Sequence, residues 1–291
     1  SAATPFLLLY FLGPKIANLV PGGATLPQFI NIRYGRTAQI VVSLVAIIYM
    51  SAFLVAEFAS INFLFPSIAE VSGLRIMILV GVFTYAYLKK SGFKASYITD
   101  KFQGIGIILL LIVLFSIWFS QNSFSEIVNY SKLGGLGTFE TFSLKSALAV
   151  ILAVTAAEIF SQGYWQRTFS AKNEKTIKKA SVISAIGAFL TILLIGIAGD
   201  VGAGKGLESP TLSFIGQLDL NLFSSVLLVS LCTLLVASSI DTLENAISST
   251  ISLDLIGKGA KEAQYITLAI IHFAIFAAIY VTNIFSVFLV A

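Results

Sequence analysis

Long apolar stretches separated by short polar breaks dominate the chain. A bilayer core about 30 Å thick needs about 20 apolar residues in each spanning helix. Eight windows of about this length contain few charged side chains and end at charged or Gly/Pro-rich segments. They cover residues 4–20, 38–64, 74–89, 104–120, 145–163, 181–199, 222–243 and 264–282. The pattern predicts an all-α fold, a polytopic bundle of transmembrane helices.

The two ends of the sequence indicate a truncated protein. The chain begins with Ser1, and neither a basic leader nor a small-residue cleavage site marks a signal peptide in the first window. At the other end, Ile284 to Ala291 is typical of the start of one more span. We expect residues 1–291 to form a single transmembrane domain that lacks further segments at both ends.

Composition and charge agree with a membrane protein. Hydrophobic residues make up 57% of the chain and charged residues only 11%, whereas soluble proteins carry about a quarter charged residues. Of the 18 basic residues, all but Arg75, Lys132, Lys145 and Lys205 lie in alternate loops on one side. The positive-inside rule places this side in the cytoplasm of a protein of the cell membrane. The net charge of +4 is therefore explained by topology, and we expect no nucleic-acid partner.

Four acidic residues, Glu57, Glu158, Asp241 and Glu244, lie within or beside the apolar windows. A charged side chain at the centre of a span costs about 2.5–3.5 kcal/mol on insertion scales, so each is a candidate for a site or pathway. Glu57 lies near the outer end of the second window and fits either a vestibule wall or a substrate contact. Glu244 fits either a snorkelling side chain or an interhelical partner.

The seventh window carries a polar stripe. Its polar residues recur at steps of three and four, which places most of them on one face of a helix. They are Ser238, Ser239, Asp241, Thr242, Asn245, Ser248, Ser249 and Ser252. Small hydroxyl residues also allow close helix packing, which would explain the serines alone. The Asp241 carboxylate beside Ser238 and Thr242 favours a cation pathway, because these groups supply hard oxygen ligands.

The fifth window contains a predicted hinge. Its apolar run from Ala147 to Ala157 is interrupted by Glu158, Gln162 and Gly163. A helix that breaks near the membrane midplane exposes backbone groups able to bind a solute. We predict substrate contacts from Thr155, Glu158 and Gln162, with Glu57 as a further candidate. The alternative is that the break is only the cytoplasmic end of a helix, with its aromatic residues at the membrane interface.

Four motifs resemble those of the sodium:solute symporter family, and they follow the family order over almost the whole chain. They are Thr25–Phe29 continuing to Gly35, Thr99–Gln103, Tyr164–Arg167 continuing to Lys172, and Ser238 through Leu255. The resemblance implies the inverted-repeat fold of the leucine transporter. It assigns core helices 2 to 9 and the start of helix 10 to this chain, which lacks the first core helix.

The resemblance also implies sodium sites. By position, the Ser238 and Ser239 hydroxyls and the Leu235 carbonyl correspond to the family's sodium ligands on core helix 8. A second sodium in some relatives maps to Asp100, Asp241 and Thr242, with Asp241 in place of a hydroxyl. Residues 186–193 lack the lysine of a sugar-carrying relative, which disfavours a sugar, whereas Glu158 suits an amino or amide group.

These observations predict sodium-coupled symport of a small polar organic solute of the amino acid, urea or amine type. The expected partners are the solute, sodium ions and the lipid bilayer. A transporter-like sensor for a signalling domain is the alternative, and a channel is a further one. We do not predict an enzyme, because the spans show no nucleophile and base pair and no metal cluster.

Overall fold

The computed structural model describes residues 3–69, 71–135, 141–207, 214–257 and 260–281. In these ranges the chain forms helices and no strands, which confirms the all-α prediction. The helices are α1 (Thr4–Leu19), α2 (Leu26–Tyr34), α3 (Arg36–Ile68), α4 (Gly73–Ser91), α5 (Phe93–Gln121), α6 (Phe124–Gly134), α7 (Thr141–Glu158), α8 (Gln162–Phe169), α9 (Glu174–Gly204), η1 (Ile215–Gln217), α10 (Leu222–Ser249), η2 (Thr250–Ile256) and α11 (Ala260–Ile279).

Each of the eight apolar windows falls mainly on helix. Four helical segments of the described chain are long and apolar enough to cross a membrane: Arg36–Pro66, Phe93–Gln121, Glu174–Gly204 and Leu222–Ile256. A bent pair of helices, α7 and α8, adds a fifth span if it crosses as one unit. The chain is therefore a polytopic membrane protein. The further span expected from Ile284 lies outside the described residues.

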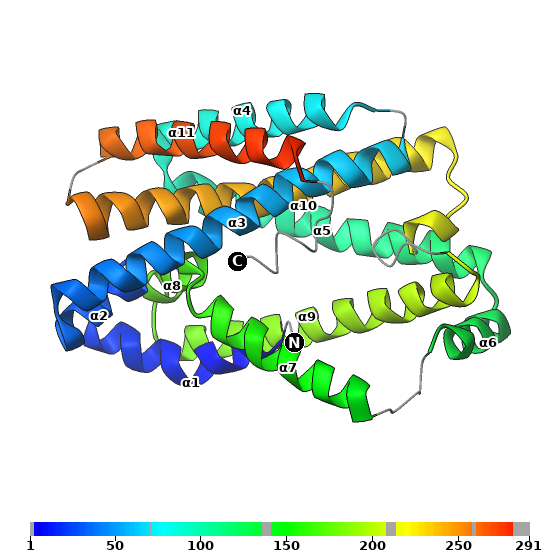
Figure 1. Cartoon of the computed structure of the whole chain (residues 1–291), viewed down its shortest axis with the longest axis horizontal. Coiled ribbons are helices and arrows are strands. Elements are labelled where there is room, and N and C mark those ends of the chain that lie inside the picture. Colours follow the sequence, from blue (N-terminus) through cyan, green and yellow to red (C-terminus); the bar gives the residue numbers. More distant parts are fainter. Residues whose placement is uncertain (1–2, 70, 136–140, 208–213, 258–259, 282–291) are drawn as a thin grey trace.

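The long helices run roughly parallel and connect at two ends of an elongated bundle (Figure 1). α10 packs against α3, α4, α5 and α11, while α1 packs against α7 and α9. The connections between α1 and α2, between α4 and α5, and between α8 and α9 lie at the same end of the bundle (Figure 1). The predicted cytoplasmic loops thus share one end, as the charge pattern requires.

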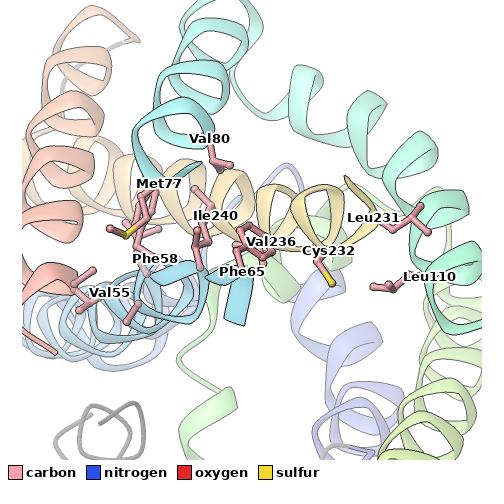
Figure 2. Packing of buried hydrophobic residues seen from close by; sticks show 14 of the residues in the cluster. Val55, Phe58, Phe65, Met77, Val80, Leu110, Leu231, Cys232, Val236 and Ile240 are labelled. Atoms are coloured by element: carbon pink, nitrogen blue, oxygen red, sulfur yellow. The ribbon is translucent and has the colours of Figure 1, made fainter. Parts of the chain in front are cut away.

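α10 lies at the centre of the main apolar cluster. Figure 2 shows Val236 and Ile240 of α10 beside Phe58 and Phe65 of α3, and Ile240 and Phe65 are fully buried. Because lipid tails are as apolar as leucine, close van der Waals packing rather than water exclusion holds such helices together. This packing fixes the position of the polar stripe that α10 carries toward its carboxyl end.

α6 and α9 approach each other at two glycines. A Cβ atom added at Gly134 would lie 1.9 Å from the Asp200 carbonyl oxygen, and one at Gly204 would lie 2.0 Å from the Tyr130 carbonyl oxygen. Both contacts are to backbone atoms, which cannot rotate away. The two helices therefore pack at a separation that only glycine allows.

Gly204→Ala is expected to lower the thermal stability of the protein because the methyl group forces α6 away from α9. Overpacking of this kind typically costs about 1–3 kcal/mol. Gly187→Ala is the matched control, since Gly187 lies on the same helix with nothing within 4 Å of an added Cβ. Thermal unfolding of the two purified variants in detergent checks the prediction. Equal melting temperatures would contradict the close approach.

Gly92 forms a one-residue junction between α4 and α5. Its φ of 50° lies in the left-handed region that glycine adopts without strain. The chain reverses there, so the last turns of α4 and the first turns of α5 lie next to each other. This junction brings Tyr87 and Ser96 to the same point of α10.

Candidate functional site

Asp241 of α10 is the centre of a buried hydrogen-bond network. Its carboxylate is fully buried and accepts from the Tyr87 hydroxyl at 2.5 Å, the Ser96 hydroxyl at 2.8 Å and the Thr99 hydroxyl at 3.1 Å. The adjacent Thr242 hydroxyl contributes a longer contact of 3.3 Å. Hydroxyl groups from α4, α5 and α10 thus take the place of water around one carboxylate.

Asp100 of α5 forms a second centre beside the first. The Arg167 guanidinium of α8 donates to Asp100 Oδ2 at 2.5 Å, and the Ser238 hydroxyl donates to Asp100 Oδ1 at 3.1 Å. The same Arg167 nitrogen reaches the Thr242 hydroxyl at 2.9 Å. The structure therefore brings together Asp100, Ser238, Asp241 and Thr242, four of the six residues predicted to bind sodium.

The other two predicted sodium residues lie apart from this group. Ser239 lies beside the Glu57 carboxylate of α3. It points away from Ser238, because successive residues of a helix point about 100° apart. Leu235 lies one turn earlier in α10, with 37% of its surface exposed. Ser238 and Ser239 thus lie beside two different carboxylates, and a joint sodium site with Leu235 stays a prediction.

Glu244 lies one turn beyond Asp241 and is fully buried. The Thr84 hydroxyl of α4 approaches Glu244 Oε1 at 3.3 Å, while Oε2 is buried without a hydrogen-bond partner. Of the two positions that the sequence allowed, the structure selects the interhelical one over a snorkelling side chain.

The predicted hinge is a break between two helices. α7 ends at Glu158, α8 begins at Gln162, and their axes differ by 57°. The break leaves backbone groups without helical partners. The Trp165 indole donates to one of them, the Ile159 carbonyl, at 2.8 Å. Trp165 is only 1% exposed, so this aromatic residue belongs to the protein interior rather than to a membrane interface.

Glu158 lies at the end of α7 and faces α3. The Tyr49 hydroxyl of α3 and the Tyr164 side chain of α8 lie near its carboxylate. Thr155 lies one turn earlier and lines the same small cavity, although its hydroxyl donates to the Ile151 carbonyl at 2.6 Å. The cavity measures about 10 Å³, which is about the smallest space that holds one water. This conformation is therefore closed around Glu158.

Gln162 joins the hinge to α2. Its side-chain oxygen accepts from the Leu26 backbone N–H at 2.9 Å, and its side-chain nitrogen donates to the Phe160 carbonyl at 2.9 Å. The neighbouring Thr25 hydroxyl donates to Asp254 of η2 at 3.0 Å. The amino end of α2 is thus tied to both the hinge and the π-helical end of α10. With both ends of its fully buried amide occupied, Gln162 positions these helices in the described conformation, and its contact with substrate stays a prediction.

A larger cavity of about 520 Å³ opens between α1, α5, α8 and α9. Arg167 lines it together with aromatic and hydroxyl side chains, which include Tyr164 and Thr168 of α8 itself and Phe6, Tyr97 and Ser181 of the other helices. The cavity lies at the end of the bundle that carries the basic loops. Because Arg167 belongs to the polar network and lines the cavity, the cavity connects this network with the predicted cytoplasmic side.

Sequence reasoning missed several residues of this site. Tyr87, Thr84 and Tyr49 lie on helices distant in sequence and carry no motif of their own. The sequence places Arg167 on the cytoplasmic side and in a family motif, but it does not predict that Arg167 pairs with Asp100. Its place in the motif that starts at Tyr164, four residues from a predicted break, is the signal that was available.

Comparisons with known proteins point to transport. No family model matches the chain. It is 28% identical over 304 residues to the spermidine transporter DUR31 of Candida albicans, covering 99% of this chain and 57% of the relative. It is 27% identical over 216 residues to the uncharacterized symporter YidK of Escherichia coli, covering 67% of this chain and 37% of that relative. The chain thus spans about half or less of the length of these relatives.

Proposed function

We propose that the protein is a secondary transporter of the sodium:solute symporter type, which couples sodium entry to uptake of a small organic solute across the cell membrane. One observation carries the proposal: a broken helix with an acidic residue at its break lies beside a buried cluster of carboxylates and hydroxyls. Broken helices near the midplane are the usual binding elements of such transporters. The two relatives, named as a transporter and a symporter, support the same class.

Sodium coupling is supported by the ligand chemistry. Asp100, Asp241, Ser238 and Thr242 provide carboxylate and hydroxyl oxygens from two helices around the fully buried Asp241. Hard oxygen donors of this kind suit a small hard cation. A third predicted contributor, the Leu235 carbonyl, would join Ser238 and Ser239 in the other proposed sodium site.

An amine is the solute class that we favour. Within the described residues the ion pairs are Arg167–Asp100 and Lys178–Glu174, so Glu57 and Glu158 have no basic partner. An acidic group without a basic partner attracts a cationic ligand. The Candida relative is named for spermidine, whose amino groups are positively charged at neutral pH. We propose that Glu158 binds an amino group and that Glu57 and Thr155 lie along the solute path.

The mechanism follows from linkage. Sodium at the α5–α10 cluster and solute at the hinge stabilise the same outward-open state, so each raises the affinity for the other. Rocking of the helices around the break then exposes both ligands to the cytoplasm. Because Ser239 lies beside Glu57, α10 carries both the proposed cation ligands and a group next to the proposed solute path.

Uptake into membrane vesicles tests this proposal. The full chain is supplied with radiolabelled amines, amino acids and urea, with either sodium or potassium outside. We expect sodium-dependent uptake of an amine that falls at least tenfold in Ser238→Ala, since a hydrogen bond to a charged group is worth about 1.5–3 kcal/mol. Ser230→Ala is the matched control, because Ser230 is exposed on the same helix and bonds only to the Val226 carbonyl.

Two results would count against the proposal. Equal uptake in sodium and potassium would remove sodium coupling while leaving transport intact. Well-expressed protein with no gradient-driven uptake of any solute would favour the sensor instead.

A further inference from the structure

A positively charged side chain already lies at the proposed sodium position. Arg167 Nη2 is 2.5 Å from Asp100 Oδ2 and 2.9 Å from the Thr242 hydroxyl oxygen. These are two of the three residues proposed to hold the second sodium. In this conformation the guanidinium thus makes the contacts that the ion would need.

The contacts of Arg167 and of sodium are mutually exclusive. Asp100 has its other oxygen occupied by the Ser238 hydroxyl, so the oxygen facing Arg167 is the one left for a cation. A sodium ion bound there would lie within a few ångströms of the guanidinium, and like charges this close repel each other. Sodium therefore binds to Asp100 and Thr242 only after the guanidinium has moved.

The structure provides space for this movement. Arg167 lines the cavity of about 520 Å³, and 36% of its side chain is exposed. Tyr97 and Tyr164 also line this cavity, and aromatic faces are favourable surfaces for a guanidinium. By contrast, Asp241 has its own hydroxyl partners and does not depend on Arg167 for hydrogen bonds.

We propose that Arg167 is a tethered cation that competes with sodium for Asp100 and Thr242. The proposal rests on the sodium coupling proposed above and assigns a regulator to that site. The Arg167 side chain is tethered because Arg167 is part of α8, and its Nη1 also donates to the Gly163 carbonyl one turn earlier at 3.1 Å. Displacement of the guanidinium by sodium removes the contacts of Arg167 with Asp100 of α5 and Thr242 of α10, while the hydrogen bond from Asn245 to Gln166 still joins α8 to α10. The ion thereby acts on the helix that follows Glu158 across the break.

Equilibrium binding of radioactive ²²Na⁺ to the purified full chain in lipid nanodiscs tests this competition. Removing the competitor in Arg167→Ala is expected to raise sodium affinity by about tenfold, the effect of one lost competing interaction. Arg167→Lys keeps the charge but loses the planar fork, so its affinity should lie between those of wild type and Arg167→Ala. Lys172→Ala is the matched control, since Lys172 lines the same cavity and has no ion-pair contact with a carboxylate in the described structure.

A gain in affinity separates the proposal from simple misfolding, which weakens binding. The competition is overturned if the wild type binds sodium as tightly as both arginine variants do, or more tightly. That result leaves sodium coupling in place. Absence of sodium binding to the wild type and all variants overturns sodium coupling and the competition together. An equal rise in affinity for Lys172→Ala would also overturn the competition, because it would show a general effect of positive charge in the cavity.

Discussion

Asp241→Ala is expected to destabilise the protein and to abolish sodium-dependent uptake. The change leaves the hydroxyls of Tyr87 and Ser96 without their shared acceptor, whereas the Thr99 hydroxyl still has the Ala95 and Ser96 carbonyls as acceptors. Each buried donor left unpaired costs about 1–3 kcal/mol, so a loss of several kcal/mol follows. Thermal unfolding in detergent measures the loss, and vesicle uptake measures the effect on transport.

Asp241→Asn separates stability from function. Asparagine keeps the volume and one acceptor oxygen, so we expect this variant to fold and to need about 10- to 100-fold more sodium for half-maximal uptake. Asp219→Asn serves as the control, because Asp219 lies exposed before α10. An Asp241→Asn protein with the sodium dependence of wild type would show that the carboxylate charge has no part in cation binding.

Glu158→Gln is expected to weaken amine uptake about 10- to 100-fold. The substitution preserves size and a hydrogen-bonding group for Tyr49 but removes the negative charge. A charge-assisted hydrogen bond is worth about 1.5–3 kcal/mol, which corresponds to this range of affinity. The half-saturating concentration of a labelled amine in vesicles measures the effect.

The control for this change is Glu262→Gln, since Glu262 is exposed on α11. Uptake of a neutral solute, if the protein carries one, should respond much less to Glu158→Gln than uptake of an amine. An unchanged half-saturating concentration for every amine would place the solute elsewhere.

The long helices were predictable because each apolar window must bury about 20 residues in lipid. The apolar windows did not predict the short helices α2 and α6, since neither is long enough to span a membrane. α6 nevertheless carried a local signal, a capping box in which Ser123 and Glu126 exchange hydrogen bonds. The Ser123 hydroxyl donates to the Glu126 carboxylate and lowers the pKa of this carboxyl.

The site was only partly predictable for a different reason. Periodicity shows that Ser238, Asp241 and Thr242 share a face of one helix, and the family resemblance adds Asp100. It does not show which side chains from other helices meet that face. The contact of Tyr87 with Asp241 spans 154 positions of sequence, and that of Arg167 with Asp100 spans 67. Such pairings depend on how the helices pack, so only the structure reveals them.

The ties at the amino end of α2 make this short helix a natural reporter of the hinge. Leu26 is bonded to Gln162 at the start of α8, so a rotation of α8 pulls directly on the first turn of α2. Ile32 and Tyr34, near the other end of α2, are 67% and 68% exposed. The nine-residue helix α2 thus transmits a rotation of α8 inside the bundle to exposed positions, where a spin label or fluorophore can record it.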